Sequence, residues 1–346
     1  MKYFAAVNIG STDITAVSAK WNKNGDYSIE AFSRVPSKGF SKGVVSEITS
    51  AVNTLGDVVK KLGQKKIKKI YAGISSSSAD MMYGSGSVLV SKYGREIYDA
   101  DIKRCTEMAS TIKIPISKEP IHKIICDFKV DGESGIRDPL NLEGVKLESE
   151  VNIITVNSSA MSNMRKCITD AGFIPAGFVF SPVAVSYRVL SEDDTQKGVM
   201  LLNLRRDAAE VLIFFRGVLR SCRVFPKGVE DMVINETEAK REALETLYHD
   251  VKDMAALDNA RKIVITGEGE IPDKVIEGIE DIFRLPVKIG TCSVRPFEKL
   301  PHERMGYVGS LGICDHFNKE REKHPSSTKL IKRLVNRSLN FLDNYF

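Results

Sequence analysis

The stretch YFAAVNIGSTDITAVSAKW (Tyr3–Trp21) decides the fold, because its pattern returns later in the chain as VMLLNLRRDAAEVLIFF (Val199–Phe215). Each stretch begins with an apolar run, turns within a few residues and enters a second run of strand-forming residues. A third run follows in each case, at Tyr27–Val35 and at Val218–Phe225. The sequence therefore predicts two three-stranded meanders in one chain.

A helix and a further strand follow each meander. Apolar residues recur at helical spacing over Ser46–Leu62, with Ser46 as the expected N-cap, and the next strand is Lys69–Ile74. After the second meander, helical sequence over Glu236–Leu257 precedes a strand at Lys262–Thr266. Two copies of β-β-β-α-β indicate an internal duplication. The predicted fold class is α/β, with two actin-like, ribonuclease-H-type halves that face each other across a cleft.

An insert separates the two copies. It contains strand-like runs at Tyr83–Ser91 and Lys123–Val130, a helix at Asp99–Ser110, and a strand at Gly144–Thr155 that we expect to return to the first half. This pattern predicts a small α+β subdomain. The expected division is a first half at 1–83 and 151–195, the inserted subdomain at 84–150, a second half at 196–317, a linker at 318–327 and a C-terminal helix at 328–346.

The last nineteen residues, TKLIKRLVNRSLNFLDNYF (Thr328–Phe346), predict an amphipathic helix. Four cations against Asp343 give this tail +3 of the chain's formal +5. An apolar stripe bordered by Lys and Arg is typical of a helix that lies in an anionic lipid interface. The alternative is a C-terminal helix docked on the body. The expected membrane-binding residues are Lys329, Leu330, Ile331, Lys332, Arg333, Leu334, Val335, Arg337, Leu339, Leu342 and Phe346.

The composition is that of an ordinary globular protein, with 42% apolar and 27% charged residues. Six Cys without a CxxC pair and only five His argue against a zinc site and against a disulfide framework. The five His are expected at the surface or at helix ends. Because the basic excess lies mostly in the tail, no nucleic-acid groove is predicted. The sequence shows no signal peptide and no apolar run of ~18 residues, so we expect a cytosolic body.

Three stretches resemble the bacterial cell-division protein FtsA, an actin relative that ties the FtsZ ring to the membrane. They are PSKGFSKGVVSEI (Pro36–Ile48), KVDGESGIRDPLNLEGVKLESEVNIIT (Lys129–Thr155) and KCITDAGFIPAGFVFSPVAVSYRVLSEDDTQKGV (Lys166–Val199). The second covers the insert that distinguishes this family from actin and Hsp70. The tail resembles the family's membrane helix. The resemblance implies a scaffold at the cytoplasmic face of the cell membrane, with an anionic membrane surface, division proteins and copies of itself as partners.

The nucleotide elements of the family are degraded in this sequence. Gly10, Ser11 and Thr12 keep a turn that suits phosphate, but Asn8 replaces the acid before them. The second turn, Leu204–Ala209, has no glycine and carries Arg205 and Arg206, which we expect to fill the cleft.

The third nucleotide element keeps only Gly267 and Gly269, with Glu268 between them. These departures predict a pseudo-ATPase with no cofactor. The segment from Gly228 to Ile263 is also short, which implies a truncated upper subdomain in the second half and makes binding of FtsZ doubtful.

Two other functions stay open. One is an active ATPase of the same superfamily that binds ATP and Mg²⁺ through the remaining turn residues. The other is an adaptor of a type IV pilus or secretion platform, which has a related architecture and binds a short peptide of a membrane protein.

Overall fold

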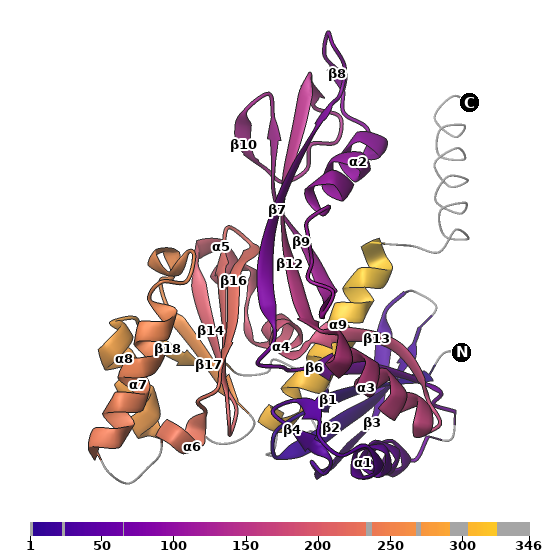
Figure 1. Cartoon of the computed structure of the whole chain (residues 1–346), viewed down its shortest axis with the longest axis vertical. Helices are drawn as coiled ribbons and strands as arrows, with labels where there is room; N and C mark the ends of the chain where they lie inside the picture. The colour runs from indigo at the N-terminus through magenta and orange to yellow at the C-terminus, as the bar shows by residue number, and fades with distance from the viewer. Residues whose placement is uncertain are drawn as a thin grey trace, which may run out of the picture.

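The computed structural model describes residues 3–22, 25–64, 66–232, 237–267, 271–290 and 304–323. Two sheets lie side by side, and the insert rises above the seam between them (Figure 1). The tail at 328–346 and the last four residues of the expected linker, 324–327, lie outside the described residues. The linker prediction was wrong for 318–323, because these residues continue the helix α9 (Val308–Lys323).

The first half is built on a five-stranded sheet of order β13-β6-β1-β2-β3. The strands β1 and β6 are parallel, whereas β1–β2 and β2–β3 are antiparallel, as the predicted meander requires. Two helices, α1 and α3, cover one face, and α4 and α9 cover the other. The bounds are β1 Tyr3–Ile9, β2 Asp13–Trp21, β3 Tyr27–Pro36, β4 Phe40–Ser41, β5 Val44–Val45, α1 Ile48–Lys61, β6 Lys69–Ile74, α3 Ser158–Asp170, β13 Ile174–Phe180, α4 Ser181–Val189 and α9 Val308–Lys323.

The second half repeats this plan with a sheet of order β16-β15-β14-β17-β18. Helices α7 and α8 cover its outer face. Between β16 and β17 the described residues form only α6, α7 and a short 3₁₀ turn, so they contain no sheet of an upper subdomain. The bounds are α5 Glu192–Lys197, β14 Val199–Leu204, β15 Ala209–Phe215, β16 Val218–Phe225, α6 Val229–Met232, α7 Thr237–Val251, η1 Leu257–Asn259, β17 Ile263–Gly267, α8 Asp273–Phe283, β18 Val287–Ile289 and η2 Arg304–Tyr307.

The expected N-cap of α1 was wrong by one residue. Glu47 is the cap, and its carboxylate accepts a hydrogen bond from the Ser50 amide at 3.3 Å. The amides of Ser46 and Glu47 both donate to the carbonyl of Gly39, so the chain completes a turn there before the helix begins. A second difference is that α7 ends at Val251, six residues before the expected end of the helix.

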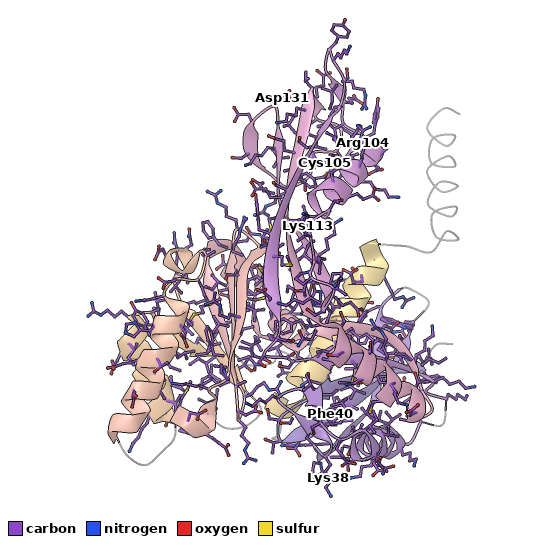
Figure 2. The ribbon with its side chains drawn as sticks, viewed as in Figure 1. Lys38, Phe40, Arg104, Cys105, Lys113 and Asp131 are labelled. Atoms are coloured by element: carbon purple, nitrogen blue, oxygen red, sulfur yellow. The ribbon has the colours of Figure 1, made fainter. Side chains whose placement is uncertain are left out.

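The insert is a four-stranded sheet of order β10-β9-β12-β7 with α2 packed on one face. Cys105 and Arg104 lie on α2, and Asp131 lies near the far end of the insert (Figure 2). The Cys105 thiol points into the sheet and donates to the carbonyl of Leu147 at 3.3 Å. The bounds are β7 Asp80–Leu89, β8 Arg95–Glu96, α2 Asp99–Ala109, β9 Lys118–Val130, β10 Glu133–Ile136, β11 Glu143–Gly144 and β12 Lys146–Asn157.

The strand expected to return to the first half, Gly144–Thr155, does so, but as β12 it belongs along its whole length to the sheet of the insert. β12 pairs with both β9 and β7, and the expected subdomain limits at 84 and 150 fall inside β7 and β12. The lower end of β12 enters the cores on both sides, because Val156 packs in the first half and Ile154 packs against the second. The Asn152 amide also donates to the carbonyl of Leu219 on β16 at 3.1 Å. The base of the insert is therefore part of the seam between the halves.

The crossing of α9 over α4 depends on a glycine. A Cβ at Gly312 would lie 1.9 Å from the carbonyl oxygen of Ala184, which is backbone and cannot rotate away. We expect Gly312→Ala to lower the free energy of unfolding by about 1–3 kcal/mol, as overpacking does. Gly56→Ala in α1 is the matched control, because a Cβ there has open space and alanine favours a helix by roughly 1 kcal/mol. Equal effects of the two substitutions in urea unfolding would contradict this account of the crossing.

Candidate functional site

The cleft lies where the first strands of the two halves end. β1 ends at Ile9 and β14 ends at Leu204, and the turn after each strand faces the opposite half. Gly10 begins the first turn with a hydrogen bond from its amide to the carbonyl of Asp13 at 3.0 Å. The second turn is closed by the amide of Arg205, which donates to the carbonyl of Ala208 at 2.8 Å.

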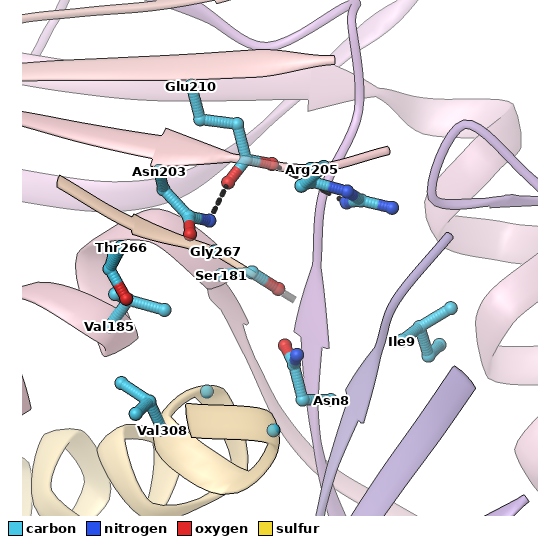
Figure 3. A pocket seen from close by; sticks show the side chains of 12 residues that line it. Asn8, Ile9, Ser181, Val185, Asn203, Arg205, Glu210, Thr266, Gly267 and Val308 are labelled. Atoms are coloured by element: carbon cyan, nitrogen blue, oxygen red, sulfur yellow. Dashed lines mark hydrogen bonds and ion pairs between the residues drawn. The ribbon is translucent and has the colours of Figure 1, made fainter. Parts of the chain in front are cut away.

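The side chain of Arg205 crosses the cleft. It is 3% exposed, and its Nε and Nη2 donate to the hydroxyl of Ser11 in the first half at 3.1 and 2.8 Å. Its Nη1 lies 3.5 Å from Oε1 of Glu210, a residue with no exposed surface (Figure 3). A buried ion pair thus occupies the space between the two turns, as expected for a bulky side chain in a turn without glycine.

The two acids of the cleft, Glu210 and Asp207, accept hydrogen bonds from residues of both halves. Glu210 accepts a hydrogen bond from the amide of Asn203 at 2.6 Å and another from the hydroxyl of Ser75 at the end of β6. The Ser11 hydroxyl donates to Asp207. Because Ser11 and Ser75 come from the first half and the other groups from the second, the network joins the halves at the two turns that the sequence resemblance assigned to nucleotide phosphates.

Little space remains beside this network. A cavity of about 30 Å³ is lined by Asn8, Ser181, Asn203, Thr266 and Gly267, among others. This volume has room for one or two water molecules. Among the described residues, Oδ1 of Asn8 and Oγ of Ser181 have no hydrogen-bond partner, so a water there would satisfy both.

The residues present do not fit a magnesium–nucleotide group. A triphosphate needs backbone amides free of Cβ atoms, and the second turn offers a guanidinium and two carboxylates instead. Within the described ranges, no three His, Cys, Asp or Glu residues are grouped as metal ligands.

The structure separates the expected nucleotide residues. Ser11 lies in the network, whereas Thr12 is exposed and its carbonyl accepts from the amide of Ser37 at 2.8 Å. Gly267 lines the cavity, and a Cβ there would lie 2.5 Å from the carbonyl of Leu204, so its small size serves strand packing. Gly269 and Glu268 lie outside the described residues.

Sequence reasoning missed Glu210, Asp207 and Ser75 as members of the site. Glu210 carried the clearest signal, because it is a lone acid at the start of the apolar strand β15. Such an acid is buried only when it is paired, and the arginine five residues earlier was the obvious partner.

A larger groove of about 670 Å³ lies between β9 of the insert, α4, α5 and α9. His122 is in its wall, and the amide of Phe180 donates to its Nε2 at 2.9 Å. Burial, aided by the nearby His316, lowers the pKa of His122 to about 3. The two imidazoles meet edge to face at 5.1 Å. His316 is buried within α9, so the expectation that all His lie at the surface or at helix ends was wrong for it, and His122 is half-buried on the strand β9.

None of the helices in the described part of the chain combines the length and the apolar character that a bilayer crossing requires. The residues expected to bind membranes, 329–346, lie outside that part.

Comparisons with known proteins agree with this architecture. Residues 78–155 match the family described as the SHS2 domain inserted in FtsA, a range that contains β7 and nearly all of β12. The cell division protein FtsA of Pseudomonas aeruginosa is 28% identical over 238 residues, which is 68% of this chain and 56% of that protein. FtsA of Bacillus subtilis is 25% identical over 277 residues, covering 77% of this chain and 63% of the relative.

Among solved structures, the PilM–PilN type IV pilus biogenesis complex contains a chain that superposes with a TM-score of 0.63 at 14% identity, covering 90% of this chain and 98% of that one. This likeness concerns the fold. The chain spans little more than half the length of the FtsA proteins named above. With two actin-type halves and an FtsA-type insert between them, the chain is an FtsA-like protein of the actin fold.

Proposed function

We propose that this protein is a membrane-associated scaffold of bacterial cell division that does not hydrolyse ATP. The observation that carries the proposal is the network centred on Arg205, which fills the cleft between the halves with the protein's own side chains. Its sequence relatives are cell division proteins. In this proposal the protein tethers division proteins to the cytoplasmic face of the membrane and associates with copies of itself.

The chemistry of the cleft favours a scaffold over an ATPase. Hydrolysis of ATP requires a phosphate cradle, a metal ion held by carboxylates and a positioned water. Here Glu210 and Asp207 are already bonded to Arg205 and Ser11, and Asn8 and Asn203 are uncharged. An ATP molecule would have to displace a buried ion pair before it could enter.

We therefore expect ATP to leave the stability of the protein unchanged. A ligand at 100 times its dissociation constant adds ~2.7 kcal/mol to the free energy of unfolding, which raises Tm by several degrees. Thermal unfolding with and without millimolar MgATP measures this directly. A clear rise in Tm that requires magnesium would favour the active-ATPase alternative.

The second part of the proposal assigns the tail to an anionic membrane. We expect Leu334→Glu, or truncation after His324, to release the protein from phosphatidylglycerol vesicles in a flotation assay, because the apolar stripe loses its insertion energy. Asn336→Gln is the matched control within the same helix. If the truncated protein still floats with the vesicles, the tail is a docked structural helix and the tether proposal fails.

The partner is open to a direct test. Affinity capture of the full chain from its native cell is expected to recover division proteins. Recovery of inner-membrane platform proteins in their place would favour the adaptor of a pilus or secretion platform.

A further inference from the structure

The segment KKLGQKKIKK contains six lysines among the ten residues Lys60–Lys69. It joins the end of α1 to the start of β6. Lys60, Lys61, Lys66 and Lys68 are exposed, and Lys69 is half-buried. Among the described residues, none of these five lies within 4 Å of an acidic group, so their charges are directed to solvent.

Strand pairing brings further residues to the same place. Lys69 pairs with Phe4 on β1 and with Ile174 on β13, and Tyr3 pairs with Lys20 on β2. The basic segment therefore lies at the end of the sheet where β1 begins, opposite the end that faces the cleft. Ile174 is 48% exposed and adds an aliphatic side chain to this surface.

The last described helix ends at the same surface. The guanidinium of Arg321 lies 3.9 Å from the centre of the Trp21 ring, and Trp21 is the last residue of β2. α9 runs across the first half to this end (Figure 1) and its last residue is Lys323. The part of the chain that the structure describes therefore ends at this surface.

We call these residues the basic face. It is defined by Lys20, Lys60, Lys61, Lys66, Lys68, Lys69, Ile174 and Arg321. The exposed acids on the elements that meet there are Asp26, Glu30, Asp57 and Glu322, fewer than the cations, and Asp170 is already paired with Lys166 at 2.7 Å. The net charge of the surface is positive.

We propose that the basic face lies against an anionic lipid bilayer, as a second membrane contact beside the tail. The inference rests on the proposed tether function, because the tail and the face engage the same bilayer. Each Lys near an acidic leaflet strengthens binding by roughly fivefold at low salt. A folded surface and a linked helix that bind one bilayer reinforce each other through a high effective concentration. The cleft and the second half then point away from the lipid.

A bilayer fits this surface better than a nucleic acid does. The lysines are spread over the end of a helix, a loop and a sheet end, and the surface also carries the exposed aliphatic side chain of Ile174. Its aromatic rings, Tyr3 and Trp21, are half-buried and already contact Lys20 and Arg321, whereas single-stranded nucleic acid is bound by rings on which bases can stack. The tail that follows α9 in the sequence carries the sequence pattern of an interfacial helix.

The test uses the full chain with Lys61, Lys66 and Lys68 all changed to Gln. The matched control changes Lys252, Lys274 and Lys288 to Gln, three exposed lysines of the second half with the same total charge. Partitioning to vesicles of phosphatidylglycerol and phosphatidylcholine is measured at low and high salt. We expect the first variant to bind more than tenfold more weakly at low salt, with the control unchanged, and the difference to shrink at high salt. Replacement of the same three lysines by Arg is expected to retain binding, which excludes misfolding as the cause.

The outcomes separate this inference from the proposed function. If the Lys-to-Gln variant binds vesicles as well as the wild-type protein does, the basic face makes no lipid contact. The inference is then wrong, whereas the proposal that the tail tethers the protein to the membrane is unaffected. If the wild-type protein binds no vesicles, both the inference about the basic face and the proposed tether function are wrong. If the variant loses affinity for duplex DNA but keeps its full affinity for vesicles, the face serves nucleic acid and the inference is overturned.

Discussion

Replacing Arg205 by methionine is expected to lower the free energy of unfolding by about 3–5 kcal/mol, the cost of removing one partner from a buried ion pair. Methionine keeps much of the volume but none of the charge. Glu210, which has no exposed surface, would then be buried without the cation that faces it, although it would keep the hydrogen bonds from the amide of Asn203 and the hydroxyl of Ser75. Ser11 would also lose its two donors from the second half.

The neighbouring residue provides the control. Arg206 is bonded to Glu230 at the surface, with side chains 56% and 59% exposed, so Arg206→Met should cost less than about 1 kcal/mol. Urea unfolding of both variants gives the comparison. We expect the double variant Arg205→Met/Glu210→Gln to be more stable than the sum of its single changes predicts, because neither partner is left alone. Equal losses for Arg205→Met and Arg206→Met would mean that the cleft is open to water.

Stability is expected to fall by about 2 kcal/mol between pH 7 and pH 5 through His122 alone. Its pKa is about 3 in the folded chain and 6.5 when unfolded, so only the unfolded state binds a proton in this range. Each pH unit below 6.5 then costs roughly 1.4 kcal/mol, and the loss continues until the pH reaches the folded pKa. Above about pH 7.5 the residue contributes almost no pH dependence, because neither state binds the proton there.

His122→Gln isolates this effect. The glutamine carbonyl reaches the position of Nε2, accepts the hydrogen bond from the amide of Phe180 and does not titrate. We expect the variant to lose about 2 kcal/mol less than the wild-type protein on going from pH 7 to pH 5. His249→Gln, on the exposed surface of α7, is the matched control for the substitution itself. If the free energy of unfolding of His122→Gln falls with pH as steeply as that of the wild-type protein, water reaches the imidazole of His122.

Much of the fold could be predicted because it is encoded in local patterns that are repeated. The strands β1 and β14 were predicted from short apolar runs, and the duplication then predicted two similar halves, which the two five-stranded sheets confirm. The predictions were wrong where pairing between distant strands, rather than the local sequence pattern, decides the structure. Nothing in Lys146–Asn157 itself distinguishes a strand of the first half from one that pairs with β7 and β9.

The site was predictable only in outline. The loss of glycine at Leu204–Ala209 indicated that side chains fill the cleft, and Arg205 does so. Its partners could not be predicted, because Ser11 and Ser75 come from segments far away in sequence. His122 was missed for a related reason, since its burial depends on three other elements that close over β9.

The position of α9 also bears on how the protein is made. The face of the first sheet that carries Phe4 and Val17 is covered by Leu311 and Ile313 of α9. A ribosome that has released the first two hundred residues has therefore produced all strands of this sheet and α4, but not α9, which completes the cover. The apolar face of this sheet is therefore exposed to aggregation with other chains until almost the whole sequence has been synthesised. Premature termination before Val308 should thus yield an aggregating fragment rather than a smaller working protein.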